Sequence, residues 1–181
     1  MAILPIITAP DPRLKEVCAA VERVDDSLRQ LMDDMLETMY QAPGIGLAAP
    51  QVGVTRRLLV VDVAREGEPP QPYRMVNPEL LSVSDEDAAY EEGCLSLPEH
   101  YAEVVRPKAI RVRYLDGQNE VRELAAEGLL ATCIQHEMDH LDGILFVDHL
   151  SALKRNMILR KLLKAKKAGK LPAPAEPSHA L

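Results

Sequence analysis

The chain has 181 residues, 47% of them hydrophobic, and a formal net charge of −7, which indicates one globular domain with a substantial core. Its three cysteines are odd in number, which argues against a disulfide framework and favours a reducing compartment. The N-terminus lacks the pattern of a signal peptide and no stretch is apolar enough to span a membrane, so we expect a cytoplasmic protein.

The charge is unevenly distributed along the chain. Residues 151–181 carry eight Lys or Arg and one acidic residue, Glu176, for a net charge of +7. Residues 1–150 therefore hold 13 of the 21 basic and 27 of the 28 acidic residues, for a net charge of −14. A basic end on an acidic body is typical of binding to a polyanion. A solvated helix end rich in lysine explains the same charge equally well.

The N-terminal part is predicted to be helical. Residues 11–20 indicate a short helix with Pro12 near its start. Asp25 or Asp26 can cap a second helix, which ends before Pro43. The apolar side of this second helix has helical spacing and consists of Leu28, Leu31, Met32, Met35, Leu36 and Met39. We interpret these side chains as core.

A glycine-containing segment follows, with the sequence Gly44-Ile-Gly-Leu-Ala-Ala-Pro-Gln51. Its small residues allow the backbone to approach another group closely. It lacks the Lys-Ser/Thr of a phosphate-binding P-loop and the third glycine of a dinucleotide fingerprint. Spacing alone therefore favours a tight turn packed against a helix, with Gln51 facing solvent.

The middle of the chain reads as β-structure. Extended segments are predicted at residues 57–63, 73–83, 90–98, 108–115 and 121–124. We expect the second of these to be one or two strands broken at Asn77-Pro78 and the third to end at Pro98. The last two form a hairpin around Asp116-Gly117.

The order of helices, strands and helices predicts an α+β fold. We expect small antiparallel or mixed sheets packed around a central helix, with N-terminal helices and a C-terminal helix at about 151–168, capped by Ser151. Residues 1–168 are predicted to form a single domain, and residues 169–181 a flexible Pro/Ala tail.

The expected central helix carries an HExxH pattern, His136-Glu-Met-Asp-His140. Positions i and i+4 share a helix face, so both imidazoles can bind one ion, and Glu137 can reach a water on that ion. Gly143 is a natural helix end. The apolar length of the helix comes from Ala125, Ala126, Leu129, Leu130, Ala131, Ile134 and Leu141. The alternative is a chance match with two surface histidines.

A protease-type third ligand downstream of the pattern fits poorly. The pattern HExxHxxG extends to Gly143, but Phe146 stands where the longer protease pattern has histidine. The downstream carboxylates are Asp142, Asp148 and Glu176, and His149 stays open as a ligand.

Two cysteines are further candidates for the third ligand. Cys133 lies seven residues before His140, about 10 Å along a helix, which exceeds the reach of a thiol whose metal–sulfur bond is about 2.3 Å. Cys94 is the better candidate, because it lies in an extended segment that can pass the helix and present its thiolate, whereas Cys18 has no such polar neighbourhood. A set of one Cys and two His leaves a position open for water, as catalytic metal sites do.

Three separate segments of the chain resemble the peptide deformylase family, in the same order: Gly44-Ile-Gly-Leu-Ala-Ala-Pro-Gln51, Glu92-Gly-Cys-Leu-Ser96 and Gln135-His-Glu-Met-Asp-His-Leu-Asp-Gly143. The start of the chain and its last helix are also similar, so the resemblance covers roughly residues 3–168. The long C-terminal helix is similar to the bacterial type I form. Tyr101 departs from the family, because many bacterial members have arginine there.

The resemblance implies a role for each matching residue. Cys94, His136 and His140 would be the metal ligands, and Glu137 the acid/base. Gln51 and the backbone N–H of Leu95 would bind the developing oxyanion. Three residues would hold the peptide backbone: Ile45, Gly46 and Gly93. The pocket for the methionine side chain would be lined by Ile45, Leu129, Cys133 and His136. Glu92 or Ser96 would orient groups around the ligands, or cap a turn.

The function implied is metal-dependent removal of the N-formyl group from the formylmethionine of new bacterial polypeptides, with release of formate. Family members use Fe²⁺, and Zn²⁺, Ni²⁺ or Co²⁺ can substitute. The expected partners are formylated nascent peptides and, through the basic C-terminal helix, ribosomal RNA; neither DNA nor a membrane is expected. The competing interpretations are a zinc endopeptidase and a peptide-binding module without catalysis.

Overall fold

A computed structural model describes residues 2–170, and its order of elements confirms the predicted α+β class. The α-helices are α1 (Asp26–Gln41), α2 (Gly128–Leu141) and α3 (Ala152–Lys167). Short 3-10 helices lie at η1 (Pro12–Lys15), η2 (Ala49–Val52) and η3 (Phe146–His149). The strands are β1 (Gly46–Ala48), β2 (Leu58–Val61), β3 (Tyr73–Val83), β4 (Asp87–Cys94), β5 (Leu97–Pro107), β6 (Ala109–Leu115) and β7 (Val121–Glu127).

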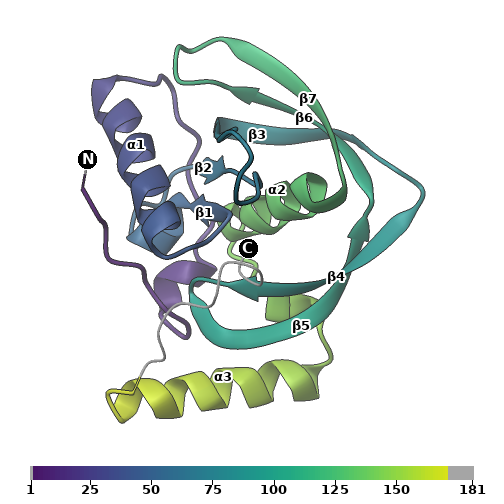
Figure 1. Cartoon of the computed structure of the whole chain (residues 1–181). Coiled ribbons are helices and arrows are strands. Elements are labelled where there is room, and N and C mark those ends of the chain that lie inside the picture. The colour runs from purple at the N-terminus through teal and green to yellow at the C-terminus, as the bar shows by residue number, and fades with distance from the viewer. Residues whose placement is uncertain (1, 171–181) are drawn as a thin grey trace.

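The strands form two antiparallel sheets. One has the order β1-β2-β3-β6-β7, and the other is the pair β4-β5. Helix α2, which carries the HExxH pattern, lies between them and contacts strands of both sheets (Figure 1). A central helix between two small sheets is the predicted arrangement.

Strand β2 shows why the β1–β2 end of the larger sheet is buried on both faces. Leu58 and Val60 pack in the cluster under α1, whereas Leu59 and Val61 pack in the cluster under α2. Because neighbouring side chains point to opposite faces, a strand covered on both sides has to be apolar throughout. The continuous run Leu-Leu-Val-Val at residues 58–61 meets that requirement.

Helix α1 forms as its sequence pattern predicts. The Asp25 carboxylate accepts a hydrogen bond from the N–H of Leu28 and caps the helix, which ends at Gln41 before Pro43. The predicted apolar side packs in one cluster with β1 and β2, and Leu31 is its half-buried member. α1 therefore covers one face of the sheet and α2 the other.

The predicted helix over residues 11–20 is wrong beyond its first turn. Only Pro12–Lys15 is helical, as η1. After it, the N–H of Cys18 donates to the carbonyl of Leu141, and Ala19 forms a bridge with Arg56. The backbone thus pairs with distant segments instead of with itself.

Two other boundaries also differ from prediction. Ala125 and Ala126 belong to β7, because they pair with Arg111 and Ile110 of β6, and α2 begins at Gly128. The extended segment predicted at residues 90–98 does not end at Pro98, because Pro98 lies inside β5. Residues 98–101 bulge opposite Gly93, so the missing N–H of the proline costs no ladder hydrogen bond.

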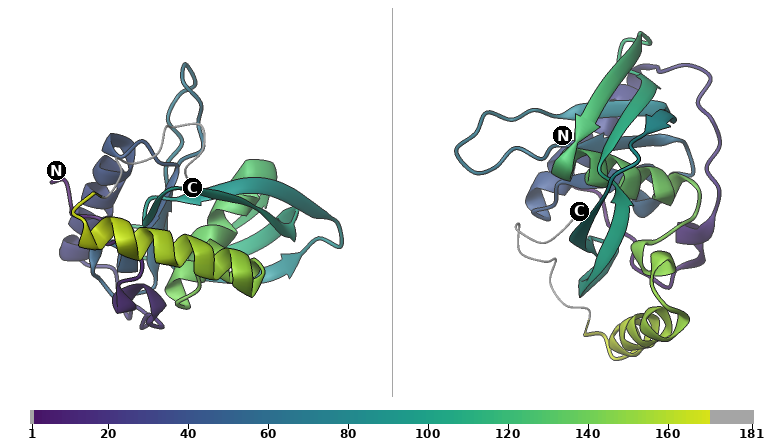
Figure 2. Two further views of the ribbon diagram at one scale, coloured as in Figure 1. Left: turned by 90° about the horizontal axis from the view of Figure 1, so that it is seen from below. Right: turned by 90° about the vertical axis from the view of Figure 1, so that its right-hand side faces the viewer.

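Helix α3 lies along one side of the molecule, away from the larger sheet (Figures 1 and 2). The hydroxyl of Ser151 accepts from the N–H of Lys154 and caps it, as predicted. Leu162 is its buried residue, and the ion pairs of Asp148 with Lys15 and Arg155 tie its start to η1. Of the predicted tail, residues 171–181 lie outside the described residues. Over residues 2–170, we find no helix with the length and hydrophobicity that crossing a membrane requires.

Candidate metal centre

Three potential ligands meet between α2 and the end of β4. Possible ligand atoms of Cys94, His136 and His140 all lie within 4.8 Å of one another. Sγ of Cys94 is 3.4 Å from Nε2 of His140. All three side chains are buried. One turn of helix places the two histidines on one face, and the turn after β4 brings the sulfur to them.

These atoms fit a divalent ion. Two ligands on a tetrahedral ion, with metal–sulfur and metal–nitrogen bonds of about 2.3 Å and 2.0 Å, lie about 3.5 Å apart. Within residues 2–170, Nε2 of His136 and both carboxylate oxygens of Glu137 are buried without a hydrogen-bond partner. Buried polar atoms normally have partners, so these atoms indicate that the site holds something further. A thiol with two imidazoles suits iron, zinc, nickel or cobalt.

Glu92 orients the His136 ring. Nδ1 of His136 lies 2.9 Å from Oε1 of Glu92, and Arg106 donates to both carboxylate oxygens at 2.7 and 2.9 Å. Burial raises the pKa of Glu92, but the hydrogen bonds from His136 and Arg106 outweigh burial and lower it to about 2. The ionised Glu92 therefore accepts the Nδ1 proton, which leaves Nε2 to face the ligand cluster.

The two histidines are affected in opposite directions. Burial lowers the pKa of His136, but the facing Cys94 and Glu92 outweigh it and raise the value to about 10. Burial, together with the positive charges of His136 and Arg106, lowers the pKa of His140 well below its usual value. The surroundings of His136 thus favour a positive charge, whether a proton or a metal ion, while His140 is neutral as a ligand must be.

Glu137 is buried beside the ligands, with Oε1 3.9 Å from Nε2 of His136. Burial raises the pKa of its carboxyl group to about 7, against the opposing effect of His136. A carboxyl with a pKa near neutrality can both take and return a proton. The backbone of β1 passes close by, because a Cβ added to Gly46 would lie 2.7 Å from Oε1. The backbone of the glycine-containing segment therefore approaches another group closely, as expected, and that group is Glu137.

The prediction that Gln51 faces solvent is wrong. Its side chain is fully buried, and Nε2 donates to Oγ of Ser96 at 3.0 Å and to Sγ of Cys94 at 3.5 Å. Its Oε1 accepts from the N–H of Ala48 at 2.9 Å. Local spacing could not reveal this, because Cys94 and Ser96 lie where β4 turns into β5, more than 40 residues further along the chain.

The remaining predicted residues lie around the same centre. Leu95 follows Cys94 in the turn between β4 and β5, and its side chain contacts Gly44. Gly93 is buried at the end of β4. Ile45, Leu129 and Cys133 pack in one apolar cluster, with Sγ of Cys133 3.5 Å from the carbonyl of Ile45. Their roles toward a substrate stay predictions.

Cys18 and His149, the other candidate ligands, lie in different surroundings. Cys18 is buried in an apolar cluster, where burial raises the pKa of its thiol. His149 is bound to Asp139 at 2.8 Å. Arg106 belongs to none of the sequence motifs, and its single signal is a charge between Val105 and Pro107 in an apolar stretch.

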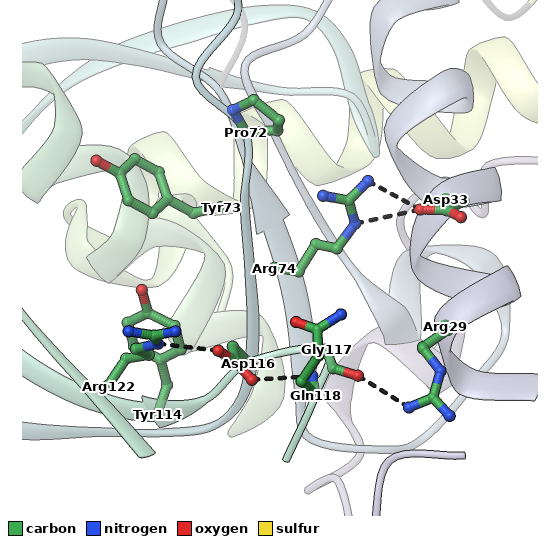
Figure 3. A pocket seen from close by; sticks show the side chains of 10 residues that line it. All are labelled: Arg29, Asp33, Pro72, Tyr73, Arg74, Tyr114, Asp116, Gly117, Gln118 and Arg122. Carbon is green, nitrogen blue, oxygen red and sulfur yellow. Dashed lines mark hydrogen bonds and ion pairs between the residues drawn. The ribbon is translucent and has the colours of Figure 1, made fainter. Parts of the chain in front are cut away.

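A separate cavity of about 420 Å³ lies between α1, the start of β3 and the β6–β7 turn (Figure 3). Its charged side chains already have partners: Arg74 donates to Asp33, Arg122 to Asp116, and Arg29 to the carbonyl of Gly117. Arg29 also forms an ion pair with Asp26, so each of these three arginines is paired with a carboxylate of the protein, and the cavity is distinct from the candidate metal site.

Comparison with known proteins supports one family. The sequence pattern described as Polypeptide deformylase matches residues 3–156. A peptide deformylase of Phenylobacterium zucineum is 61% identical and covers 93% of this chain and 99% of its own length. A peptide deformylase of Mesorhizobium japonicum is 56% identical and covers 94% of this chain and 99% of its own.

Solved structures agree in fold as well as in sequence. A peptide deformylase from Ehrlichia chaffeensis has a TM-score of 0.89 at 41% identity, covering 94% of this chain and 100% of its own. A structure of peptide deformylase from the same organism in complex with actinonin has a TM-score of 0.86 at 44% identity, covering 92% of this chain and 98% of its own. With the fold, the ligand cluster and the matching pattern in agreement, the chain belongs to the polypeptide deformylase family.

Proposed function

We propose that Cys94, His136 and His140 hold one divalent ion and that Glu137 is the acid/base of the reaction. As a member of this family, the chain is a peptide deformylase, which removes the N-formyl group from nascent polypeptides. The observation that carries the assignment of residues is the buried Cys-His-His cluster beside a carboxyl group whose pKa is about 7. We further propose that residues 1–168 act as one metallohydrolase domain.

We propose Fe²⁺ as the native ion, with Zn²⁺, Ni²⁺ or Co²⁺ able to replace it. A thiolate and two neutral imidazoles bind each of these ions, so the ligand set by itself does not select among them. Metal analysis of protein purified without oxygen tests the assignment. A content of about one iron per chain supports Fe²⁺, and zinc in its place contradicts it.

Glu137 moves the protons of the reaction. An ion held by Cys94, His136 and His140 would lower the pKa of a water molecule and polarise the formyl carbonyl. Glu137 takes a proton from the attacking water, and the water oxygen adds to the formyl carbon. As the carbon–nitrogen bond breaks, Glu137 returns the proton to the leaving amine, so that formate and a free N-terminal methionine result.

Gln51 and Leu95 stabilise the charge that develops on the formyl oxygen. We propose that Nε2 of Gln51 and the backbone N–H of Leu95 donate hydrogen bonds to it. Gln51 is held by Ala48 and Ser96, so its amide is oriented before the substrate arrives. Loss of one such donor typically costs about 3–4 kcal/mol in the transition state.

Strands on either side of the centre hold the substrate. β1 ends the larger sheet and β4 pairs with β5, so each strand can add an extended peptide along its remaining edge. We propose that Ile45, Gly46 and Gly93 bind the peptide backbone. In the same proposal Ile45, Leu129 and Cys133 line the pocket for the methionine side chain. Formyl is the smallest acyl group, so a tight cleft excludes acetylated chains.

Release of formate from formyl-Met-Ala-Ser by the Ni²⁺-loaded protein tests the function. Glu137→Ala should abolish turnover while Ni²⁺ stays bound, and Glu91→Ala, at an exposed position of β4, should leave it unchanged. Cleavage of an internal peptide bond would support an endopeptidase instead. Binding of the peptide without turnover would support a binding module.

The basic helix α3 suggests where the enzyme acts. It carries seven Lys or Arg and no acidic residue, and its basic side chains are exposed apart from the half-buried Arg155. Formylated chains emerge in the cytoplasm from ribosomes, whose surface is rich in phosphate, so we propose that α3 binds ribosomal RNA. Co-sedimentation with ribosomes at low and high salt tests this, and binding that salt does not weaken would contradict it.

A further inference from the structure

A chain of hydrogen-bonded polar side chains leads from the His136 ligand to the surface. Beyond Glu92, Arg106 also donates through Nη1 to Oδ2 of Asp139 at 2.9 Å. Nε2 of His149 lies 2.8 Å from the same oxygen. The side chains are 5% exposed at Arg106, 22% at Asp139 and 37% at His149. The chain crosses β4, β5, α2 and η3, and the mechanism above uses only its inner end.

Arg106 is held at both ends of its guanidinium group. Nε and Nη2 bind the two oxygens of Glu92, while Nη1 binds Asp139. The guanidinium is planar and rigid, so two carboxylates on different elements fix its plane. Oε1 of Glu92 accepts hydrogen bonds from both Nη2 of Arg106 and Nδ1 of His136. The placement of Arg106 therefore determines the placement of the oxygen that orients the ligand ring.

His149 holds Asp139 in place. Asp139 is half-buried on α2, and a carboxylate there is free to turn toward solvent unless something binds it. His149, the last residue of η3, supplies that contact at the oxygen that Arg106 uses. An isolated pair of this kind at the surface contributes little, because solvent competes with it and screens it. This pair differs because its carboxylate also binds a buried arginine.

We propose that Asp139 and His149 are positioning residues for the metal centre. They fix Arg106, and through it the Glu92 carboxylate that presents Nε2 of His136 to the ion. The inference rests on the proposed ligation by His136. Asp139, the second variable position of the HExxH pattern, and His149, outside the pattern, thereby gain a function.

The test measures how fast the Ni²⁺-loaded protein loses its metal to excess chelator. Partners that orient a ligand typically contribute 10–100-fold to metal affinity, and His149 acts one step further out. We expect His149→Ala to release Ni²⁺ about 3–10-fold faster and Asp139→Asn at least as fast. His149→Gln should release it at the wild-type rate, because its amide N–H can donate to Asp139 from nearly the same place.

Arg57→Ala is the matched control. Arg57 also ties the end of α2, through the carbonyl of Leu141 and the carboxylate of Asp142, but it has no contact with Arg106 among its hydrogen bonds in the described structure. It should release Ni²⁺ at the wild-type rate. Equal release by His149→Ala and wild type would overturn the proposal. So would release from His149→Gln or Arg57→Ala as fast as from His149→Ala.

Failure of the proposed function would look different. If Cys94→Ala bound Ni²⁺ as tightly as wild type, the ligand assignment itself would be wrong. If Cys94→Ala lost the ion while His149→Ala behaved as wild type, the ligands would stand and only the positioning role would fall. The unfolding temperature of each metal-free variant, measured in parallel, separates a change at the site from a general loss of stability.

Discussion

The charges around the metal centre and the charges of α3 are arranged in opposite ways. Near the ligands, Glu92 and Arg106 are at most 5% exposed, and each is hydrogen-bonded to a specific partner. On α3, basic side chains such as Lys154 and Lys164 are exposed, and Leu162 is the buried residue of the helix. Charged side chains thus form internal contacts in one region and an external surface in the other.

The difference determines what each charge can do. A buried ion is stable only with its partners, so removing one partner leaves the other uncompensated. An exposed lysine interacts weakly with its own protein and keeps its charge available for another molecule. We therefore expect substitutions near the ligands to affect folding and catalysis, and substitutions on α3 to affect association alone.

Replacing the central buried cation should have the largest effect on stability. Arg106→Met leaves the Glu92 carboxylate buried without its cation, which we expect to lower the free energy of unfolding by about 3–5 kcal/mol. Urea denaturation measures this. Arg111→Met is the control, because Arg111 pairs with Glu123 on the surface, and it should change stability by less than about 1 kcal/mol. Equal effects of the two variants would contradict the comparison.

Replacing the buried amide should affect catalysis more than stability. We expect Gln51→Met to lower kcat for formyl-Met-Ala-Ser by about 10²–10³-fold while Ni²⁺ stays bound, because the proposed donor to the developing oxyanion is lost. Formate release and metal analysis measure the two effects. Gln41→Met alters an exposed glutamine at the end of α1 and should leave kcat unchanged. If Gln51→Met kept the full kcat, Gln51 would not be a donor to the oxyanion.

The turn after α2 should tolerate no side chain. Gly143 has φ of +73°, and an added Cβ would lie 2.4 Å from the carbonyl oxygen of Lys15, a backbone atom. We expect Gly143→Ala to lower the free energy of unfolding by at least about 1–3 kcal/mol. Gly117→Ala is the control, since open space surrounds Gly117, and thermal unfolding of the two should differ clearly. A Gly143→Ala protein as stable as wild type would show that the N-terminal segment can move away from α2.

Neutralising α3 should have the smallest effect on the isolated enzyme. We expect the combined change of Lys154, Arg160, Lys164 and Lys167 to glutamine to alter stability by no more than about 0.5 kcal/mol per site. Formate release should be unchanged. Ribosome co-sedimentation at low salt should fall strongly, because four of the charges that we propose to bind phosphate are lost. Unchanged co-sedimentation would remove the proposed function of α3, and a large loss of stability would contradict its description as external surface.

Elements with a strong local pattern were predictable. The apolar side of α1, its Asp25 cap and the Ser151 cap of α3 follow from residues within one or two turns of each other. The β6–β7 hairpin likewise follows from alternation around Asp116-Gly117. The boundaries that failed, at residues 16–20, at Ala125-Ala126 and at Pro98, are places where the backbone pairs with a distant strand or bulges away from one.

The candidate site divides in the same way. The spacing of His136 and His140 is a property of one helix, so the sequence by itself determined that both rings face one point. Only the tertiary structure decided what else meets them. Gln51, Cys94 and Arg106 come from three other segments, and their burial and partners depend on how two sheets pack around α2. Local periodicity follows from backbone geometry over a few residues, whereas a buried charge or amide depends on contacts between segments that no local pattern encodes.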